Sequence, residues 1–183
     1  MKIVVAVTAA SGAIYARLTV EALLRSAEVE RIALIYSTHA AEVAEYEGVR
    51  MPDDERIDVY RNDDMFAPPA SGSAAYDAMI VVPCSAGTLG RIAAGVSQTL
   101  IERTADVMLK ERRRLVLALR EAPYSLIHLR NMATVTECGA VVIPASPSFY
   151  SRPQSIQELC GTVVGRILHH AGIECELYEW KGR

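Results

Sequence analysis

The sequence lacks the features that mark several large classes of protein. Its longest apolar runs, at residues 79–83 and 115–119, fall far short of the roughly 20 residues needed to cross a bilayer. The cysteines at positions 84, 138, 160 and 175 are widely separated and form no CxxC pair. That spacing argues against both a zinc site and a disulfide framework. We therefore expect free thiols, no metal and no membrane partner.

Strong net charge is also missing. The 183 residues carry a net charge of -3, which gives no general electrostatic reason to expect nucleic acid or an anionic membrane surface as partner. Residues 1–2 lead directly into a strand-like run, without the charged region, apolar region and cleavage site of a secretory signal, so we expect a cytoplasmic protein. HExxH, GxSxG, Walker and GxGxxG motifs are all absent, which leaves no common catalytic signature.

Short β-branched runs alternate with longer segments of helical period, and this alternation predicts a parallel sheet covered by helices. The runs that read as strands are residues 3–8, 32–37, 79–83, 115–120 and 140–144. The segments that read as helices are residues 13–26, 39–48, 88–96, 99–112, 128–137 and 154–171. With 51% hydrophobic residues and no long linker, the chain is expected to form one α/β domain of Rossmann-like or flavodoxin-like type over residues 1–183.

Small and hydroxyl residues follow three of the predicted strands. They are the stretch TAASGA at residues 8–13, Ser37 with Thr38, and CSAGT at residues 84–88. In a doubly wound sheet, ligands bind outside the carboxyl ends of the strands, where the first amides of each helix can donate to a phosphate. The same serines and threonines could simply cap the helices, and the two roles are compatible. The polar segment 62–77 reads either as a mobile lid or as a solvated crossover loop.

Cations gather between residues 102 and 121. Arg112, Arg113 and Arg114 read as part of a solvated face, whereas Arg120 ends an apolar strand and should point into the mouth of the proposed pocket. Glu121 follows it directly and could donate or accept a proton there. Arg103 and Lys110 lie seven residues apart and share a helix face.

In combination, four stretches resemble the UbiX-like flavin prenyltransferases: TAASGAIYA, VVPCSAGTL, RTADVMLKERRRLVLALREAP and PSFYSRPQS. The resemblance covers nearly the whole chain in the expected order. It implies a metal-independent enzyme that transfers a dimethylallyl group from dimethylallyl monophosphate to N5 and C6 of reduced flavin mononucleotide (FMN). It also implies assembly as a homododecamer and delivery of the prenylated flavin to a separate UbiD-like decarboxylase.

The resemblance also implies roles for individual residues. It assigns Glu121 and Glu47 to the reacting centre, with Glu121 expected to transfer the proton. It assigns flavin binding to Ala9, Ala10, Ser11, Ser37, Ser85, Ala86, Gly87, Thr88 and Arg120. It assigns binding of the prenyl donor to Tyr150, Arg166, Arg103, Lys110 and Trp180. Arg103 and Lys110 are expected to come from a neighbouring subunit. Trp180 is expected to lie in a C-terminal tail, about residues 172–183, that covers the site.

The sequence departs from the family at four places. It has TAASG for TGASG, CSAGT for CSMKT, which removes a lysine near the flavin phosphate, SQTL for SDNL, and Glu179 where an arginine is frequent. Two other functions stay open. One is an FMN-dependent cysteine decarboxylase, although residues 13–26 lack the histidine that such an enzyme uses. The other is a noncatalytic flavin-carrying subunit, which would need neither Glu121 nor the cation set.

Overall fold

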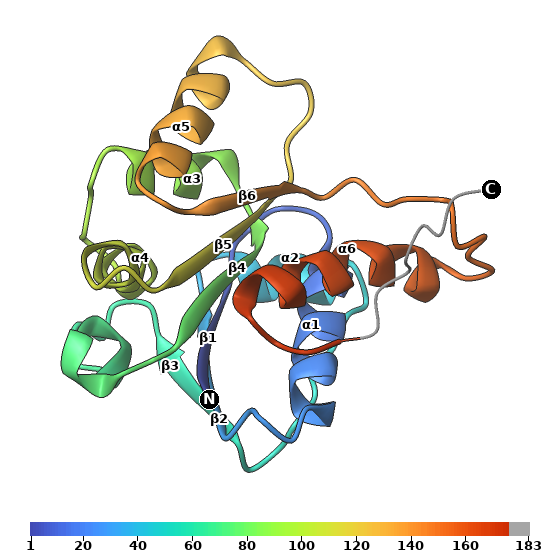
Figure 1. Cartoon of the computed structure of the whole chain (residues 1–183), viewed down its shortest axis with the longest axis horizontal. Helices are drawn as coiled ribbons and strands as arrows, with labels where there is room; N and C mark the ends of the chain where they lie inside the picture. The colour runs from blue at the N-terminus through green and yellow to red at the C-terminus, as the bar shows by residue number, and fades with distance from the viewer. Residues whose placement is uncertain (176–183) are drawn as a thin grey trace.

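The computed structural model describes residues 1–175, which form a six-stranded parallel sheet with helices on both faces (Figure 1). The strands are β1 (Lys2–Val7), β2 (Arg31–Tyr36), β3 (Ile57–Arg61), β4 (Ala78–Cys84), β5 (Arg114–Leu119) and β6 (Val141–Pro144). The helices are α1 (Ala13–Arg25), α2 (Ala40–Tyr46), α3 (Ala86–Ala93), α4 (Leu100–Lys110), α5 (Leu126–Glu137) and α6 (Ile156–Ala171), with the 3-10 turns η1 (Pro68–Ala70) and η2 (Gly72–Ala74).

The strand order, β3-β2-β1-β4-β5-β6, is that of a doubly wound sheet. The chain reverses its winding direction between β1 and β4, and this topological switch point is where such sheets bind ligands. The expected fold class is confirmed, and each strand and helix expected from the sequence is present with its ends within three residues of the expected positions.

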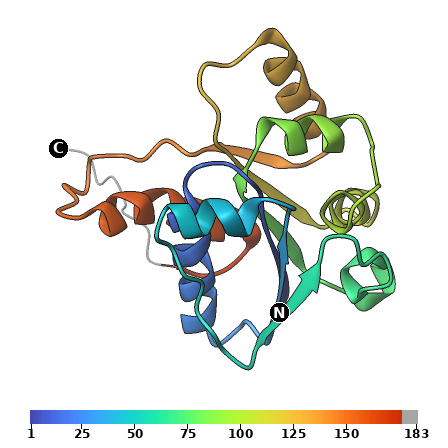
Figure 2. The same ribbon diagram turned by 180° about the vertical axis from the view of Figure 1, so that it is seen from behind.

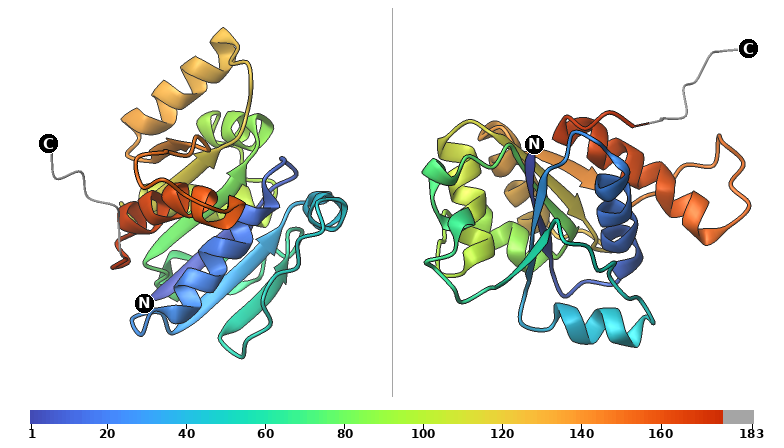
Figure 3. Two further views of the ribbon diagram at one scale, coloured as in Figure 1. Left: turned by 90° about the vertical axis from the view of Figure 1, so that its right-hand side faces the viewer. Right: turned by 90° about the horizontal axis from the view of Figure 1, so that it is seen from below.

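The two faces of the sheet bury separate apolar cores. Residues of β1, β4 and β5 that point one way pack against α1 and α6, and those that point the other way pack against α3 and α4. The view from below in Figure 3 shows these two helix layers on opposite sides of the sheet. Every residue of β4 is buried, as expected for a central parallel strand that is covered on both faces.

Strand β3 was not expected from the sequence. It pairs in parallel with β2 at the edge of the sheet, and Val59 in its middle is largely exposed. An edge strand of five residues, IDVYR, needs no continuous apolar run because only part of it is covered. The apolar patterning that identified the other strands is therefore weak here.

The segment between β3 and β4 is a crossover connection, mostly exposed, that packs against the protein at three of its residues. Ala67, Pro69 and Tyr76 are buried. The backbone oxygen of Ala70 accepts a hydrogen bond from Arg103 Nε at 3.1 Å, and that of Gly72 accepts one from Arg113 Nη2 at 2.9 Å. The expectation that Arg113 belongs to a solvated face was wrong, because its guanidinium binds this segment and its Nη1 atom is buried.

Two further findings bear on the exclusions made from the sequence. All four cysteines are free thiols, and Cys84 and Cys160 are buried. No helix within residues 1–175 combines the length and the apolar character that a membrane span requires.

Candidate functional site

The carboxyl ends of β1 and β4 are joined by Thr8 at the topological switch point. The buried Thr8 hydroxyl donates to the backbone oxygen of Pro83 at 2.7 Å and accepts from the amide of Ser85 at 2.8 Å. The Thr8 side chain thus fixes the distance between the loops after β1 and β4, which the sequence predicts at the floor of the pocket. The neighbouring end of β2 joins them, because the amide of Ala9 donates to Ser37 Oγ at 3.1 Å.

Within the first loop, residues 8–13, Gly12 is the one residue with a left-handed backbone conformation. Gly12, which precedes α1, has φ 106°, in the left-handed region where a glycine is favoured. Ala9 has no positive φ, so the alanine that replaces the family's glycine at this position is compatible with the loop. Ala10 is buried and Ser11 is exposed. The loop therefore offers both backbone and a hydroxyl at the site.

Glu47 links the end of α2 to the start of α1. Figure 2 shows α2 crossing above α1, and the Glu47 carboxylate accepts from the amides of Gly12 at 2.9 Å and Ala13 at 2.8 Å. Burial raises the pKa of Glu47, but hydrogen bonds from Ser11, Gly12 and Ala13 and the charge of Arg120 outweigh burial and lower this pKa. Glu47 is therefore a carboxylate that orients the first loop.

The loop after β4 begins α3. Ser85 caps that helix by accepting from the amide of Thr88 at 3.2 Å, and its hydroxyl donates to Thr88 Oγ1 at 3.1 Å. The amides of Ala86 and Gly87, in the first turn, have no partner inside the helix. Capping and anion binding are thus compatible here, because the cap uses one amide and leaves others available.

Arg120 directly follows β5, and its backbone amide donates to the backbone oxygen of Cys84 at 3.0 Å. Arg120 therefore lies beside the loop that leads from β4 to α3. Its Nε atom is buried and makes no hydrogen bond within residues 1–175. A buried guanidinium donor without a partner fits an acceptor atom of a bound ligand. Glu121, the next residue, is partly buried, and among residues 1–175 its carboxylate accepts only from the amide of Ala122, at 3.0 Å.

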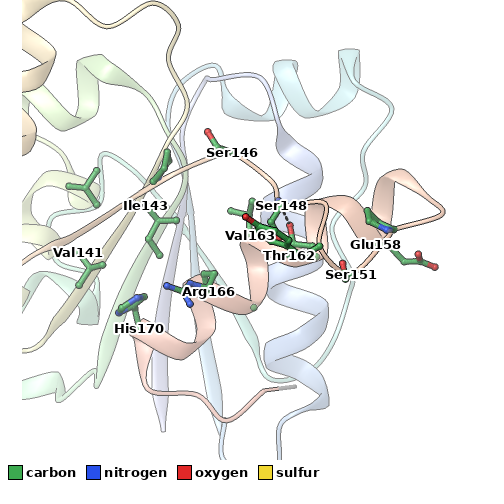
Figure 4. A pocket seen from close by; sticks show the side chains of 16 residues that line it. Val141, Ile143, Ser146, Ser148, Ser151, Glu158, Thr162, Val163, Arg166 and His170 are labelled. Carbon is green, nitrogen blue, oxygen red and sulfur yellow. Dashed lines mark hydrogen bonds between the residues drawn. The ribbon is translucent and has the colours of Figure 1, made fainter. Parts of the chain in front are cut away.

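Tyr150 and Arg166 line a single cavity of about 920 Å³ between β6 and α6. Figure 4 shows Arg166 and His170 projecting from α6 toward the strand that carries Val141 and Ile143. The loop that leads to Tyr150 is anchored where the Ser148 amide donates to Thr162 Oγ1 at 3.0 Å. Two of the residues proposed for the prenyl donor thus share one cavity.

The structure does not bring Arg103 and Lys110 to this cavity within one chain. Arg103 binds Ala70 and Asp106, while Lys110 forms an ion pair with Glu111 at the far end of α4. Helix α4 starts beside Asn62, at the carboxyl edge of the sheet, and ends before β5 begins at the opposite edge. Trp180 and Glu179 lie outside the described residues.

Sequence reasoning missed one ion pair at the site. Arg91 of α3 binds Glu102 of α4, whose side chain is only 3% exposed. The spacing of Thr99 and Glu102 is a capping-box pattern, and the structure forms both of its hydrogen bonds. This signal was readable in the sequence, but nothing in the sequence pointed to Arg91 as the partner.

Comparisons with known proteins agree with this geometry. Residues 1–168 match the family model for Flavoprotein. A flavin prenyltransferase UbiX from Methanocaldococcus jannaschii is 43% identical over 182 residues, covering 98% of this chain and 97% of the relative. The crystal structure of AnUbiX (PadA1) in complex with FMN and dimethylallyl pyrophosphate has a TM-score of 0.92 at 46% identity, covering 100% of this chain and 98% of that chain.

A dodecameric FMN-dependent Ubix-like decarboxylase from Escherichia coli O157:H7 has a TM-score of 0.91 at 37% identity, and the alignment covers 100% of both chains. The resemblance noted from the sequence is confirmed. The chain belongs to the flavin prenyltransferase UbiX family.

Proposed function

We propose that this chain transfers a dimethylallyl group from dimethylallyl monophosphate to reduced FMN, forming prenylated FMN. The observation that carries the proposal is Arg120, whose buried Nε has no hydrogen-bond partner within residues 1–175. It stands beside the α3 loop, and its charge acts on Glu47 of the first loop. A flavin supplies both the polar ring edge that this guanidinium fits and, when reduced, an electron-rich nitrogen for alkylation.

The strand-end loops are proposed to hold the flavin. The amides of Ala86 and Gly87 and the hydroxyl of Ser37 offer donors to the phosphate and the ribityl chain, and the Ser11 hydroxyl, which donates to Glu47, offers an acceptor. Thr8 and Glu47 are proposed to act without contacting the flavin, because their hydrogen bonds fix the loops that carry those donors. Arg120 is proposed to hold the ring edge.

The cavity between β6 and α6 is proposed to hold the prenyl donor. Cleavage of an allylic carbon–oxygen bond places negative charge on the leaving phosphate, which cations stabilise. Tyr150 and Arg166 line the cavity and supply a hydroxyl and a guanidinium. Arg103 and Lys110 are proposed to complete the cation set from a neighbouring subunit, since α4 holds Lys110 at the opposite edge of the sheet in its own chain.

Glu121 is proposed to move the proton that ring closure requires. In the described part of the chain its carboxylate accepts one hydrogen bond, from the amide of Ala122, so it has capacity for a further one. Glu47 was expected at the reacting centre as well. A positioning role is proposed for it instead, because Oε1 already accepts from the amide of Gly12 and Oε2 from that of Ala13.

Assembly and product transfer are part of the proposal. A structural relative of 37% identity is dodecameric, and a homododecamer is proposed here; the requirement for α4 of another subunit gives a physical reason for assembly. A UbiD-like decarboxylase is proposed to receive the product. A noncatalytic carrier is less well supported, because a carrier needs no donor cavity with a guanidinium and a hydroxyl.

Product transfer gives a direct functional test. The enzyme is incubated with reduced FMN and either dimethylallyl monophosphate or the pyrophosphate, and the protein-free product is added to a UbiD-like apo-decarboxylase. Decarboxylation with the monophosphate is expected. Activity with the pyrophosphate alone would reassign the donor, and activity with neither donor would contradict the proposed function.

A further inference from the structure

The first turn of α3 carries no cation of its own, but a guanidinium lies over it. Arg91 reaches back along the helix, and its Nη2 donates to Thr88 Oγ1 at 3.2 Å. A β carbon built on Gly87 would lie 3.4 Å from Arg91 Nη1. The charge of Arg91 therefore stands beside the amides of Ala86 and Gly87, in the loop that we propose for the flavin phosphate.

Glu102 fixes this guanidinium in place. Its carboxylate is almost fully buried and accepts from Arg91 Nε and from the amides of Gln98 at 3.0 Å and Thr99 at 3.1 Å. Burial raises the pKa of Glu102, but these three donors and the charge of Arg91 outweigh it and lower the pKa, so the carboxylate stays ionised. The start of α4 also offsets the negative charge of Glu102.

One donor group of the guanidinium remains available. Nε is used by Glu102 and Nη2 by Thr88, whereas Nη1 makes no hydrogen bond within the described residues. The Arg91 side chain is 49% exposed, so a ligand can reach it. An arginine already held by a buried carboxylate loses less side-chain freedom when it binds an anion than a free one would.

We propose that Arg91 is a phosphate-binding residue of the flavin site, oriented by Glu102, and that it supplies the positive charge missing from the Ser85–Thr88 loop. The assignment rests on the proposed function. It predicts that Arg91 contributes to the binding affinity for FMN, which carries a phosphate, and not to the affinity for riboflavin, which has none. A purely structural ion pair would affect both flavins equally.

The test measures dissociation constants of FMN and riboflavin for the intact protein. Arg91→Ala is expected to weaken FMN binding about 10-fold, in line with loss of a charge-assisted hydrogen bond, and to change riboflavin binding less than about 2-fold. Arg25→Ala, an exposed arginine at the end of α1, is the control for altered net charge and should leave both constants unchanged.

Two further variants separate phosphate binding from folding. Arg91→Ala leaves the buried Glu102 without its cation, so it is also made together with Glu102→Gln, and the same selective loss of FMN affinity is expected. Gly87→Lys is then added to Arg91→Ala. Gly87 has no positive φ and enough space for a β carbon, so the new ammonium group should restore selectivity for FMN.

The outcomes distinguish the two proposals. Equal weakening of FMN and riboflavin, or no change in either, would overturn the role of Arg91 while the proposed function stands. Failure of the unaltered protein to bind FMN would overturn the proposed function and the role of Arg91 with it.

Discussion

Glu47 Oε1 lies 2.9 Å from the amide nitrogen of Gly12, so a carboxylate from the end of α2 holds the turn that begins α1. This contact connects two segments 35 residues apart in sequence and sets the shape of the first loop of the site. Since the carboxylate also accepts from Ala13, it occupies the start of α1, where an anion is favoured by the helix dipole.

The first prediction concerns the pH dependence of this contact. The pKa of Glu47 is lowered in the folded protein, so the contact stabilises the fold above the ordinary value of 4.5, and that stability is lost as the pH falls through the folded value. Glu47→Gln should reduce the free energy of unfolding at pH 7 by about 1 to 2 kcal/mol and by less at pH 3. Urea unfolding at both pH values measures the difference, and an equal loss at both would contradict the role of the charge.

The second prediction concerns Arg120. Because its Nε has no partner within residues 1–175, Arg120→Ala should change the free energy of unfolding by less than about 1 kcal/mol but weaken FMN binding about 10-fold or more. Flavin fluorescence titration and urea unfolding measure the two effects.

Arg113→Ala is the matched control for Arg120→Ala. It removes a guanidinium that binds Gly72 and should therefore destabilise the fold while leaving FMN affinity unchanged. If the two variants show the reverse pattern, the assignment of Arg120 to the flavin is wrong.

The third prediction concerns proton transfer. Glu121→Gln keeps the shape of the side chain but removes its ability to exchange a proton, so single-turnover formation of prenylated flavin should slow by about 100-fold or more. FMN affinity should stay within about 2-fold, because Glu121 is not proposed to bind the flavin. Retention of full turnover would remove Glu121 from the mechanism.

The fourth prediction tests whether the site is shared between subunits. Glu121→Gln and Lys110→Ala subunits should each be nearly inactive alone. Oligomers assembled from an equal mixture should regain about a quarter of the activity, since one site in four then receives an intact Glu121 and an intact Lys110 from different chains. The control is a solution of the two preformed variant oligomers that have not been dissociated, so that no subunits exchange. No recovery in verified mixed oligomers would place Lys110 and Glu121 in the same chain's site or remove Lys110 from it.

The sequence predicted the parts of the fold that depend on continuous burial. The four central strands have strong apolar patterns because both faces of the sheet are covered, and the edge strand β6 was also predicted, because its sequence VVIP is a continuous apolar run. Strand β3 was missed because an edge strand leaves residues such as Val59 exposed, and hydrogen bonding to β2, rather than apolar patterning, defines it.

The site was predictable where a motif places a residue at a strand end, and less so where contacts join distant segments. Arg120 and Glu121 follow β5 as the sequence indicated. The attachment of Arg113 to Gly72 joins residues 41 positions apart, and that of Arg91 to Glu102 depends on the packing of two helices. Such pairs are set by tertiary structure, so a run of charged residues alone does not reveal which cations are solvated.

The measurement that tests the central claim most directly is mass spectrometry of the flavin released after anaerobic incubation of the purified protein with reduced FMN and dimethylallyl monophosphate. A reaction without protein is the control. The account predicts that the flavin gains the mass of one prenyl unit only when the protein is present. Release of unmodified FMN from protein that binds both compounds would contradict it.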